Sequence, residues 1–182
     1  MCLVSNHTSK IQEIFLSGIR DVYWETDFLL ITLDVTSLYT SIDHNLGIES
    51  CRHFLKTRSI SYHAHTEMLL NMLEFCLTHN YFIFDDKTYC QQQGTAMGSC
   101  FAPSYANLFM GWWEERVANN VQGFEHVVLW QRFIDDLFLI WKGNERQAKE
   151  FIDLLNQNNY NLRFTSHISD KEIVFLDTKI TV

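Results

Sequence analysis

The sequence predicts an α+β fold in which an antiparallel sheet is backed by helices on one face. Short apolar runs, such as residues 28–33, are typical of buried strands, and longer segments, such as residues 66–79, have the apolar spacing of helices. The chain has 182 residues, of which 47% are hydrophobic and 20% charged. It is therefore large enough for one domain with its own core.

The first elements are a helix and a strand. Residues 10–20 have helical apolar spacing, and residues 28–33 predict a buried strand with Asp34 at its end. Asp43 is suited to cap a helix that runs to about residue 56.

Thr66 is suited to cap the next helix, which should run to about residue 79. Its apolar residues form a wide stripe, the pattern of a helix that packs against a core. They are Met68, Leu69, Met72, Leu73, Phe75 and Cys76. Residues 81–84 and 87–91 predict a small hairpin that turns at Asp85 and Asp86.

A long helix and a second hairpin dominate the second half of the chain. The helix is expected over residues 99–120, after a glycine-bearing loop. Strands at residues 125–133 and 137–141 enclose Ile134, Asp135 and Asp136, so we expect a tight hairpin with carboxylates at its tip. The last predicted elements are a helix capped by Asn144 and two closing strands, at residues 161–168 and 172–181.

Two acidic positions stand out because apolar strands flank them. Asp34 follows one strand, and Asp135 with Asp136 lies between two others far later in the chain. If these strands are neighbours, three carboxylates meet at one edge of the sheet, and their repulsion favours a divalent cation. Oxygen ligands of this kind suit Mg²⁺ or Mn²⁺, and two such ions support in-line phosphoryl transfer. The alternative is an ordinary turn, which we expect for Asp85 and Asp86.

The charge balance does not fit a nucleic-acid partner in a simple way. The chain carries 14 Lys and Arg against 22 Asp and Glu, a formal net charge of −8. Either the partner is not nucleic acid or the basic surface lies outside this chain. No apolar run reaches membrane-spanning length and no signal peptide begins the sequence, so we expect no membrane contact and an intracellular, nuclear location.

Three segments resemble, in order, the A, B and C motifs of reverse transcriptases. They are residues 33–39 (LDVTSLY), residues 93–99 (QGTAMGS) running on to Ala102, Pro103 and Asn107, and residues 133–136 (FIDD). The segment FLD at residues 175–177 follows them. Within that group, residues 34–42 and 94–111 look most like the Penelope-like retroelement enzymes.

The resemblance implies a reverse transcriptase palm with part of the fingers and no thumb. It covers about residues 28–182, and the whole chain would be a single reverse transcriptase domain fragment or truncated copy. Fingers-side helices and hairpin are expected at about residues 1–30 and 43–92, and the palm at about residues 31–42 and 93–182.

The resemblance also implies a metal site. Asp34 and Asp135 would be the main ligands of two Mg²⁺ ions, which Mn²⁺ can replace, with Asp136 as the adjacent, less direct one. The main-chain carbonyl of Val35 would add a ligand.

Substrate contacts are implied at three further positions. Tyr39 matches the aromatic residue that lies under the sugar of the incoming nucleotide and selects deoxynucleotides, and Gln93 with Gly94 matches the pair that contacts the dNTP. A buried aromatic residue and a plain structural loop remain the alternatives. Arg52 and Lys56 share a helix face and are candidate nucleic-acid contacts, although an ordinary solvated helix surface is the favoured explanation.

The implied activity is that of an RNA-directed DNA polymerase of a retroelement. It would add dNTPs to the 3′-hydroxyl of a primer on an RNA or DNA template. One alternative is an inactive or domesticated copy that acts as a binding module. Another palm-type nucleotidyl transferase, such as a nucleotide cyclase, is disfavoured by residues 93–107.

Overall fold

The computed structural model describes residues 10–57 and 63–182, apart from the side chains of four residues. Those four are Ile11, Ile14, His63 and Ala64. The chain divides into two compact units. Unit 1 comprises Met1–Val35, Asn120–Gln157 and Arg163–Val182, and unit 2 comprises Thr36–Asn119 and Asn158–Leu162.

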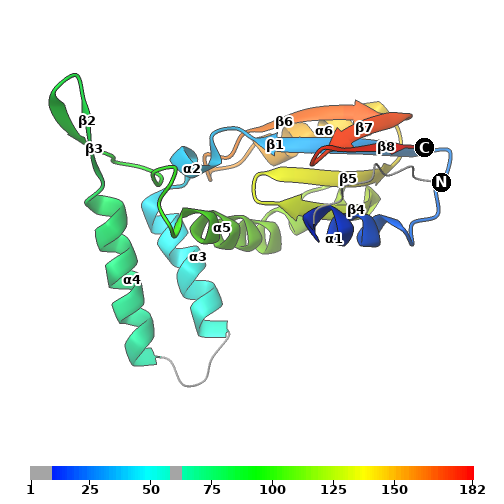
Figure 1. The fold of residues 1–182 in the computed structure, drawn as a ribbon. Helices are drawn as coiled ribbons and strands as arrows, with labels where there is room; N and C mark the ends of the chain where they lie inside the picture. Colours follow the sequence, from blue (N-terminus) through cyan, green and yellow to red (C-terminus); the bar gives the residue numbers. More distant parts are fainter. Residues whose placement is uncertain (1–9, 58–62) are drawn as a thin grey trace. The chain divides into compact units, whose positions relative to one another are not determined.

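Unit 1 is built on strands and unit 2 on helices, as labelled in Figure 1. Unit 1 contains α1 (Lys10–Ile19), β1 (Phe28–Val35), η2 (Phe124–His126), β4 (Val127–Phe133), β5 (Asp136–Lys142), α6 (Glu145–Asn156), β6 (Phe164–Ser169), β7 (Glu172–Phe175) and β8 (Thr178–Thr181). Unit 2 contains α2 (Leu38–Ser41), α3 (His44–Thr57), α4 (His63–Thr78), β2 (Tyr81–Phe84), β3 (Lys87–Cys90) and α5 (Ala102–Arg116). The short helix η1 (Ala118–Asn120) follows α5.

The core of unit 1 is an antiparallel sheet with the strand order β4-β5-β1-β6. Its central strands β1 and β5 pair along their whole length, with Leu30 opposite Ile140. Five consecutive residues of β5, from Leu137 to Trp141, are buried. Such an unbroken apolar run is the pattern of a strand that is covered on both faces.

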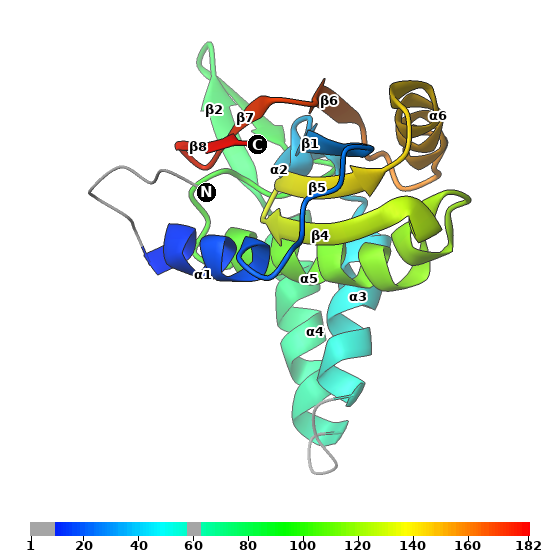
Figure 2. The same cartoon turned by 90° about the vertical axis from the view of Figure 1, so that its right-hand side faces the viewer.

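Both faces of this sheet are covered, which corrects the expectation of helices on one face. On one face, Leu30 and Ile140 form a core cluster with Phe15 of α1 and Phe175 of β7. On the other face, Trp141 packs against Phe151 of α6, with ring centroids 5.1 Å apart. Figure 2 shows α6 on one side of the sheet and α1 with the β7–β8 hairpin on the other. The unbroken apolar run at residues 137–141 already favoured this arrangement over cover on one face, because a strand buried on both faces does not alternate.

Unit 2 is a helical unit in which α3 packs against α4 and α5. The carboxylate of Asp43 caps α3 as predicted, because its Oδ1 accepts the N–H groups of Asn45 (2.9 Å) and Leu46 (3.1 Å). Helix α5 carries Pro103 in its first turn, where a missing N–H is tolerated. Seven of its residues are buried, so it forms most of the core of this unit.

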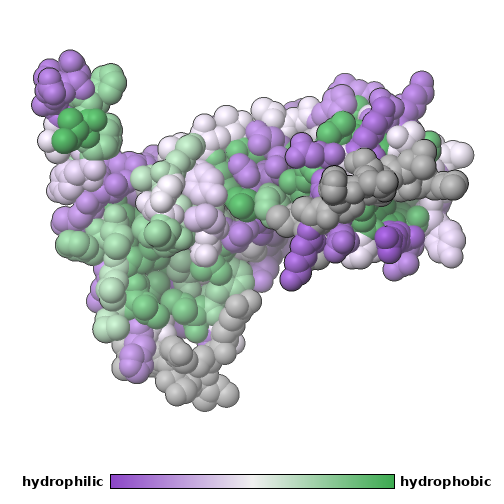
Figure 3. All heavy atoms as spheres, in the orientation of Figure 1, coloured by the Kyte–Doolittle hydropathy of each residue, from purple (hydrophilic) through white to green (hydrophobic). Residues whose placement is uncertain are grey.

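The apolar stripe of α4 is exposed, contrary to the predicted packing. Met68, Met72 and Phe75 are 53%, 58% and 61% exposed, whereas Leu70 and Leu77 on another face of the helix are buried. Figure 3 shows hydrophobic side chains gathered over α4. Apolar periodicity identifies residues that share a helix face, but it does not say whether that face has a partner.

Other elements also differ from the prediction, among them the helix expected over residues 99–120, which is α5 (Ala102–Arg116). The closing segment holds three strands rather than two, because Leu176 and Asp177 adopt positive φ angles (46° and 61°) and reverse the chain between β7 and β8. Helix α4 begins at His63 rather than at Thr66. The division into fingers-side and palm residues stays a prediction. Among the helices of the described residues, none has the length and apolar character needed to span a lipid bilayer.

Candidate active site

The two acidic positions of the sequence lie side by side in unit 1. In the pairing of β1 with β5, Asp34 is directly opposite Asp136. The main-chain N–H of Val35 donates to the main-chain oxygen of Asp135 over 3.1 Å. Directly opposed residues project from the same face of a sheet with Cβ atoms about 5 Å apart. The predicted meeting of these acidic positions is thus present in the fold.

The carboxylates stand at the tip of a two-residue hairpin. Phe133 of β4 pairs with Asp136 of β5, which leaves Ile134 and Asp135 as the turn. Ile134 has a φ angle of 56°, a left-handed conformation that a β-branched residue rarely adopts. The guanidinium of Arg132 donates to the carbonyl oxygen of Ile134 over 3.1 Å. This bond and the one from Val35 to Asp135 hold the strained turn in place.

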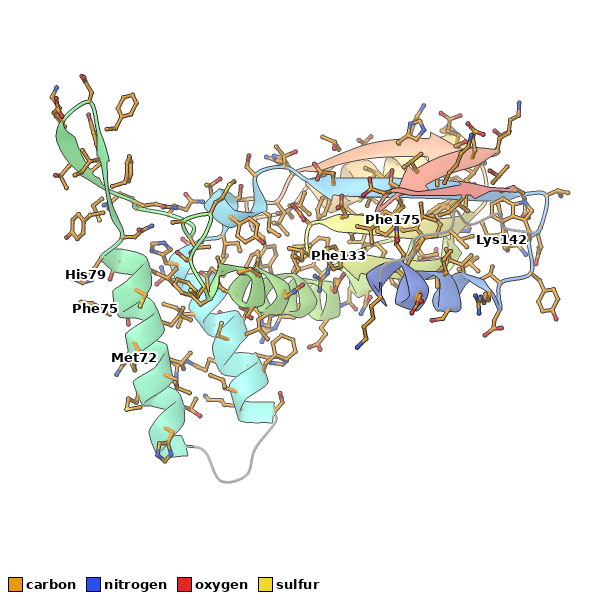
Figure 4. The ribbon with its side chains drawn as sticks, viewed as in Figure 1. Met72, Phe75, His79, Phe133, Lys142 and Phe175 are labelled. Atoms are coloured by element: carbon orange, nitrogen blue, oxygen red, sulfur yellow. The ribbon has the colours of Figure 1, made fainter. Side chains whose placement is uncertain are left out.

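Within unit 1, this end of the sheet face is less covered than the rest, because Asp34 is exposed and Asp136 is half-buried. Phe138, two residues after Asp136 on the same face, already packs against Phe15 and Phe175 (ring centroids 5.0 and 5.6 Å apart). Figure 4 shows Phe133 and Lys142 at opposite ends of the β4–β5 ribbon, with Phe175 over the stretch between them. The carboxylates therefore lie beyond the part of the face that Phe15 and Phe175 cover.

Burial, and after it repulsion between the carboxylates, raises the pKa of two of them. Partial burial, and then the charge of Asp135, raises the pKa of Asp34. Burial, followed by the charges of Asp135 and Asp34, raises the pKa of Asp136. A raised pKa means that the folded chain makes the ionised carboxylate less favourable than it is in water. A bound cation would offset this cost.

The donor set fits a hard divalent cation in its chemistry. Asp34, Asp135 and Asp136 supply only carboxylate oxygens, the ligands that Mg²⁺ and Mn²⁺ prefer. Within residues 10–57 and 63–182, no three His, Cys, Asp or Glu side chains are already gathered as a metal site. The three carboxylates would have to draw closer together to share an ion.

The predicted nucleotide contacts lie in unit 2, where hydrogen bonds link them. Tyr39 is half-buried on the one-turn helix α2, and Gln93 and Gly94 form part of the loop after β3. The side-chain amide of Gln93 donates to the main-chain oxygen of Ser41 (2.7 Å). The main-chain N–H of Thr95 donates to the main-chain oxygen of Tyr39 (2.7 Å). The loop and the residue that carries the aromatic ring are therefore one hydrogen-bonded piece.

Gly94 is required by its own main chain. It has a φ angle of 71°, its N–H donates to Ile42 over 3.0 Å, and a Cβ atom there would lie 2.4 Å from the main-chain oxygen of Tyr39. No side chain fits at that distance. The resemblance assigns Gly94 to contact with the dNTP, whereas the structure supplies a sufficient reason for glycine within the protein itself.

The candidate nucleic-acid contacts lie on α3. Arg52 forms an ion pair with Glu67 of α4, which lowers the pKa of Glu67. Lys56 is exposed in the last turn of α3. The pair connects two helices of unit 2, so Arg52 has a structural role whether or not it contacts a template.

Three residues important to these arrangements were not found from the sequence. They are Arg132, which bonds the turn at Ile134, Thr95, which bonds Tyr39, and His44, whose ring bonds Gly94. Thr95 and His44 bond main-chain groups that are distant in the sequence and come close only after folding, and Arg132 bonds a turn whose strained geometry local pattern does not predict. No spacing rule could reveal such contacts.

A family model described as reverse transcriptase (RNA-dependent DNA polymerase) matches residues 15–169. The chain belongs to the reverse transcriptase family. The match includes every predicted site residue, from Asp34 to Asp136. Among curated proteins, none is a significant match to the sequence.

Solved polymerase structures share the fold of this reverse transcriptase chain. Apo telomerase from Candida tropicalis, truncated from its C-terminal domain, superposes with a TM-score of 0.69 at 14% identity, over 97% of this chain and 39% of that one. Telomerase from Candida albicans in complex with the TWJ fragment of telomeric RNA gives 0.69 at 9% identity, over 93% and 32%. The RNA-dependent RNA polymerase of BmCPV at its elongation state gives 0.60 at 14% identity, over 86% and 16%.

These similarities establish the palm fold, a mixed arrangement of helices and antiparallel sheet. The chain spans well under two thirds of the length of the telomerases that it matches. The predicted palm fold is confirmed.

Proposed function

We propose that this chain is the core of an RNA-directed DNA polymerase, which adds dNTPs to the 3′-hydroxyl of a primer on a nucleic-acid template. The supporting observation is the pairing of Asp34 with Asp136 next to Asp135, at one end of a palm sheet. Carboxylates from distant parts of a sequence have no structural reason to meet, since their repulsion opposes folding.

Each carboxylate has its own place in the proposed chemistry. Asp34 and Asp135 would hold two Mg²⁺ ions with help from the carbonyl of Val35, and Asp136 would tune their charge. When bound, the ions make the primer hydroxyl more acidic and neutralise charge on the transferred phosphate. The protein supplies rigidity, because the hairpin tip is fixed by the β1–β5 pairing and by Arg132.

The nucleotide contacts are assigned by position in the family motifs. Tyr39 would lie under the sugar and exclude a 2′-hydroxyl by contact with its ring. Gln93 and Gly94 would contact the dNTP; the Oε1 of Gln93 is available for this while its Nε2 holds Ser41. Arg52 and Lys56 would contact the template strand.

The biological setting is part of the proposal. The segments at residues 34–42 and 94–111 support a retroelement enzyme of the Penelope-like kind. Such an enzyme would act on RNA or DNA templates inside the nucleus.

The test compares two Asp→Asn variants in primer extension on an RNA template with Mg²⁺. Asp135→Asn should lower kcat by at least about 10³-fold, or about 4 kcal/mol in the activation barrier. Asp86→Asn is the matched control, since Asp86 also belongs to an Asp-Asp hairpin turn, in unit 2, and asparagine tolerates its φ angle of 56°. It should retain wild-type turnover.

Near-normal turnover by Asp135→Asn would remove the proposed mechanism. Absence of primer extension by the wild-type protein, together with no Mn²⁺ binding in calorimetry, would favour the binding-module alternative. Product formation without primer or template would instead point to another palm-type nucleotidyl transferase.

A further inference from the structure

A histidine outside the three motifs holds the loop of Gln93 and Gly94. The Nε2 atom of His44, the first residue of α3, lies 2.7 Å from the main-chain oxygen of Gly94. Because a carbonyl oxygen only accepts, the imidazole donates this bond. Both the Nε2-protonated neutral ring and the imidazolium can do so, and the bond is therefore compatible with either charge state.

His44 has a rigid base from which to make this bond. It follows Asp43, whose carboxylate caps α3 by accepting the N–H groups of Asn45 and Leu46 (2.9 and 3.1 Å). The capped helix start fixes the main chain of His44. Its ring therefore ties the loop to α3, in addition to the bonds that tie the loop to α2.

Loss of the ring would disturb more than one main-chain group. Gly94 is buried, and a buried carbonyl that loses its donor makes the loop shift toward another donor or toward water. The same loop donates the N–H of Thr95 to the main-chain oxygen of Tyr39 over 2.7 Å. A shift of the loop would therefore move the residue that carries the ring of Tyr39.

We infer that His44 is a positioning residue that sets both dNTP affinity and the discrimination against ribonucleotides. Selection by a ring depends on its exact placement, since a small displacement makes room for one extra hydroxyl. His44 does so without contact with the nucleotide, through Gly94 and Thr95. This inference rests on the proposed function, because it assumes that Tyr39 and Gln93 meet the incoming nucleotide.

The experiment uses three variants of the full-length protein in primer extension. His44→Phe keeps an aromatic ring but loses the donor, and His44→Gln keeps a donor. His79→Phe is the control, because the ring of His79 in the same unit also lies within bonding distance of a main-chain oxygen, but of Phe75 in α4 (3.1 Å) rather than of Gly94. Steady-state constants are measured for a dNTP, for the matching rNTP and for primer–template.

His44→Phe should raise the KM for dNTP by about five- to tenfold, the effect of one lost hydrogen bond. Its preference for dNTP over rNTP in kcat/KM should fall by about fivefold, with the KM for primer–template changed less than about twofold. His44→Gln should restore both values to within about twofold of wild type. His79→Phe should match wild type throughout.

A second readout does not depend on activity. Hydrogen–deuterium exchange should show faster exchange of the amides of Gly94 and Thr95 in His44→Phe, and not in His79→Phe or His44→Gln. Unchanged exchange together with unchanged nucleotide discrimination would overturn the inference. The wild-type protein could fail to extend primers while exchange in the three variants changes as expected. In that case the proposed function fails, and the structural role of the bond from His44 to Gly94 stands.

Discussion

At the scale of single residues, the carboxylates of unit 1 oppose stability, and we propose that they serve the polymerase reaction. Asp34 and Asp136 face each other across two strands, and each has a raised pKa because of burial and neighbouring charge. Residues that a fold holds against their own electrostatics are typical of active sites. The strained φ angle of Ile134 at the same hairpin is a second feature of this kind.

Replacing Asp136 with asparagine should stabilise the protein at neutral pH without divalent ions. A raised native pKa means that the folded state binds more protons than the unfolded state, so stability falls as pH rises from the ordinary value of 3.8 through the native pKa. Asparagine does not ionise, so the variant does not lose stability in this way as the pH rises. Because solvent screens a partly exposed group, we expect a melting temperature only about one to two degrees higher at pH 7.

Thermal melts between pH 3 and pH 7 measure this effect. The difference between Asp136→Asn and wild type should shrink as the pH falls from 7 through the raised native pKa toward 3.8. Asp153→Asn, a change of an exposed residue on α6, is the control and should leave the melting temperature unchanged. A lower melting temperature for Asp136→Asn at pH 7 would contradict the account of mutual repulsion.

At the scale of elements, α4 has two apolar faces and only one of them is packed. Leu70 and Leu77 are buried, with α3 as the neighbouring helix, while Met72 and Phe75 point to solvent. Figure 4 shows Phe75 on the side of α4 away from α3, together with His79, on which its ring stacks at 4.1 Å.

The two faces of α4 should respond differently to substitution. Met72→Gln should change the free energy of unfolding by less than about 0.5 kcal/mol, because Met72 is 58% exposed. Leu70→Ala should lower it by about 2 to 4 kcal/mol, since it removes a side chain that is 2% exposed. Denaturant titrations of the two variants measure both values. A large loss in Met72→Gln would mean that this face is packed in solution.

The hairpins show what the sequence could predict at this scale. Residues 81–84 and 87–90 were predicted within one residue, because turn-forming Asp85 and Asp86 separate two β-favouring runs. The turn at Leu176 and Asp177 was missed, because leucine, unlike the aspartate at the first position of the other turn, has no preference for a positive φ angle. Local chemistry identifies a turn only where residues with a preference for positive φ occupy it.

In the candidate site too, features set by neighbouring residues could be predicted from the sequence, and contacts between distant residues could not. The carboxylate tip at Asp135 could be predicted from its flanking strands, and its meeting with Asp34 followed as a hypothesis about strand neighbours. The bond from His44 to Gly94 could not be predicted, because it joins a helix start to a loop that lies fifty positions later in the chain. Such contacts are fixed by tertiary packing rather than by local pattern.

At the scale of the whole molecule, the charge limits what the chain can do by itself. Its formal net charge of −8 opposes contact with a phosphate backbone, and Arg52 is already paired with Glu67. The 182 residues alone should bind a primer–template duplex with a Kd weaker than about 10 μM at 150 mM salt. Fluorescence anisotropy with labelled duplex measures this, and nanomolar binding that weakens steeply with salt would contradict it.

The sheet order has a consequence for biosynthesis. Strand β1 is hydrogen-bonded to β5 and β6, both of which follow almost all of unit 2 in the chain. A ribosome therefore releases β1 first and makes a helical unit before either partner strand leaves the exit tunnel. Until then Leu30, Ile31 and Leu33 have no sheet to cover them. The nascent chain is most in need of a chaperone during that interval, because its future central strand is still unpaired and its apolar side chains are exposed.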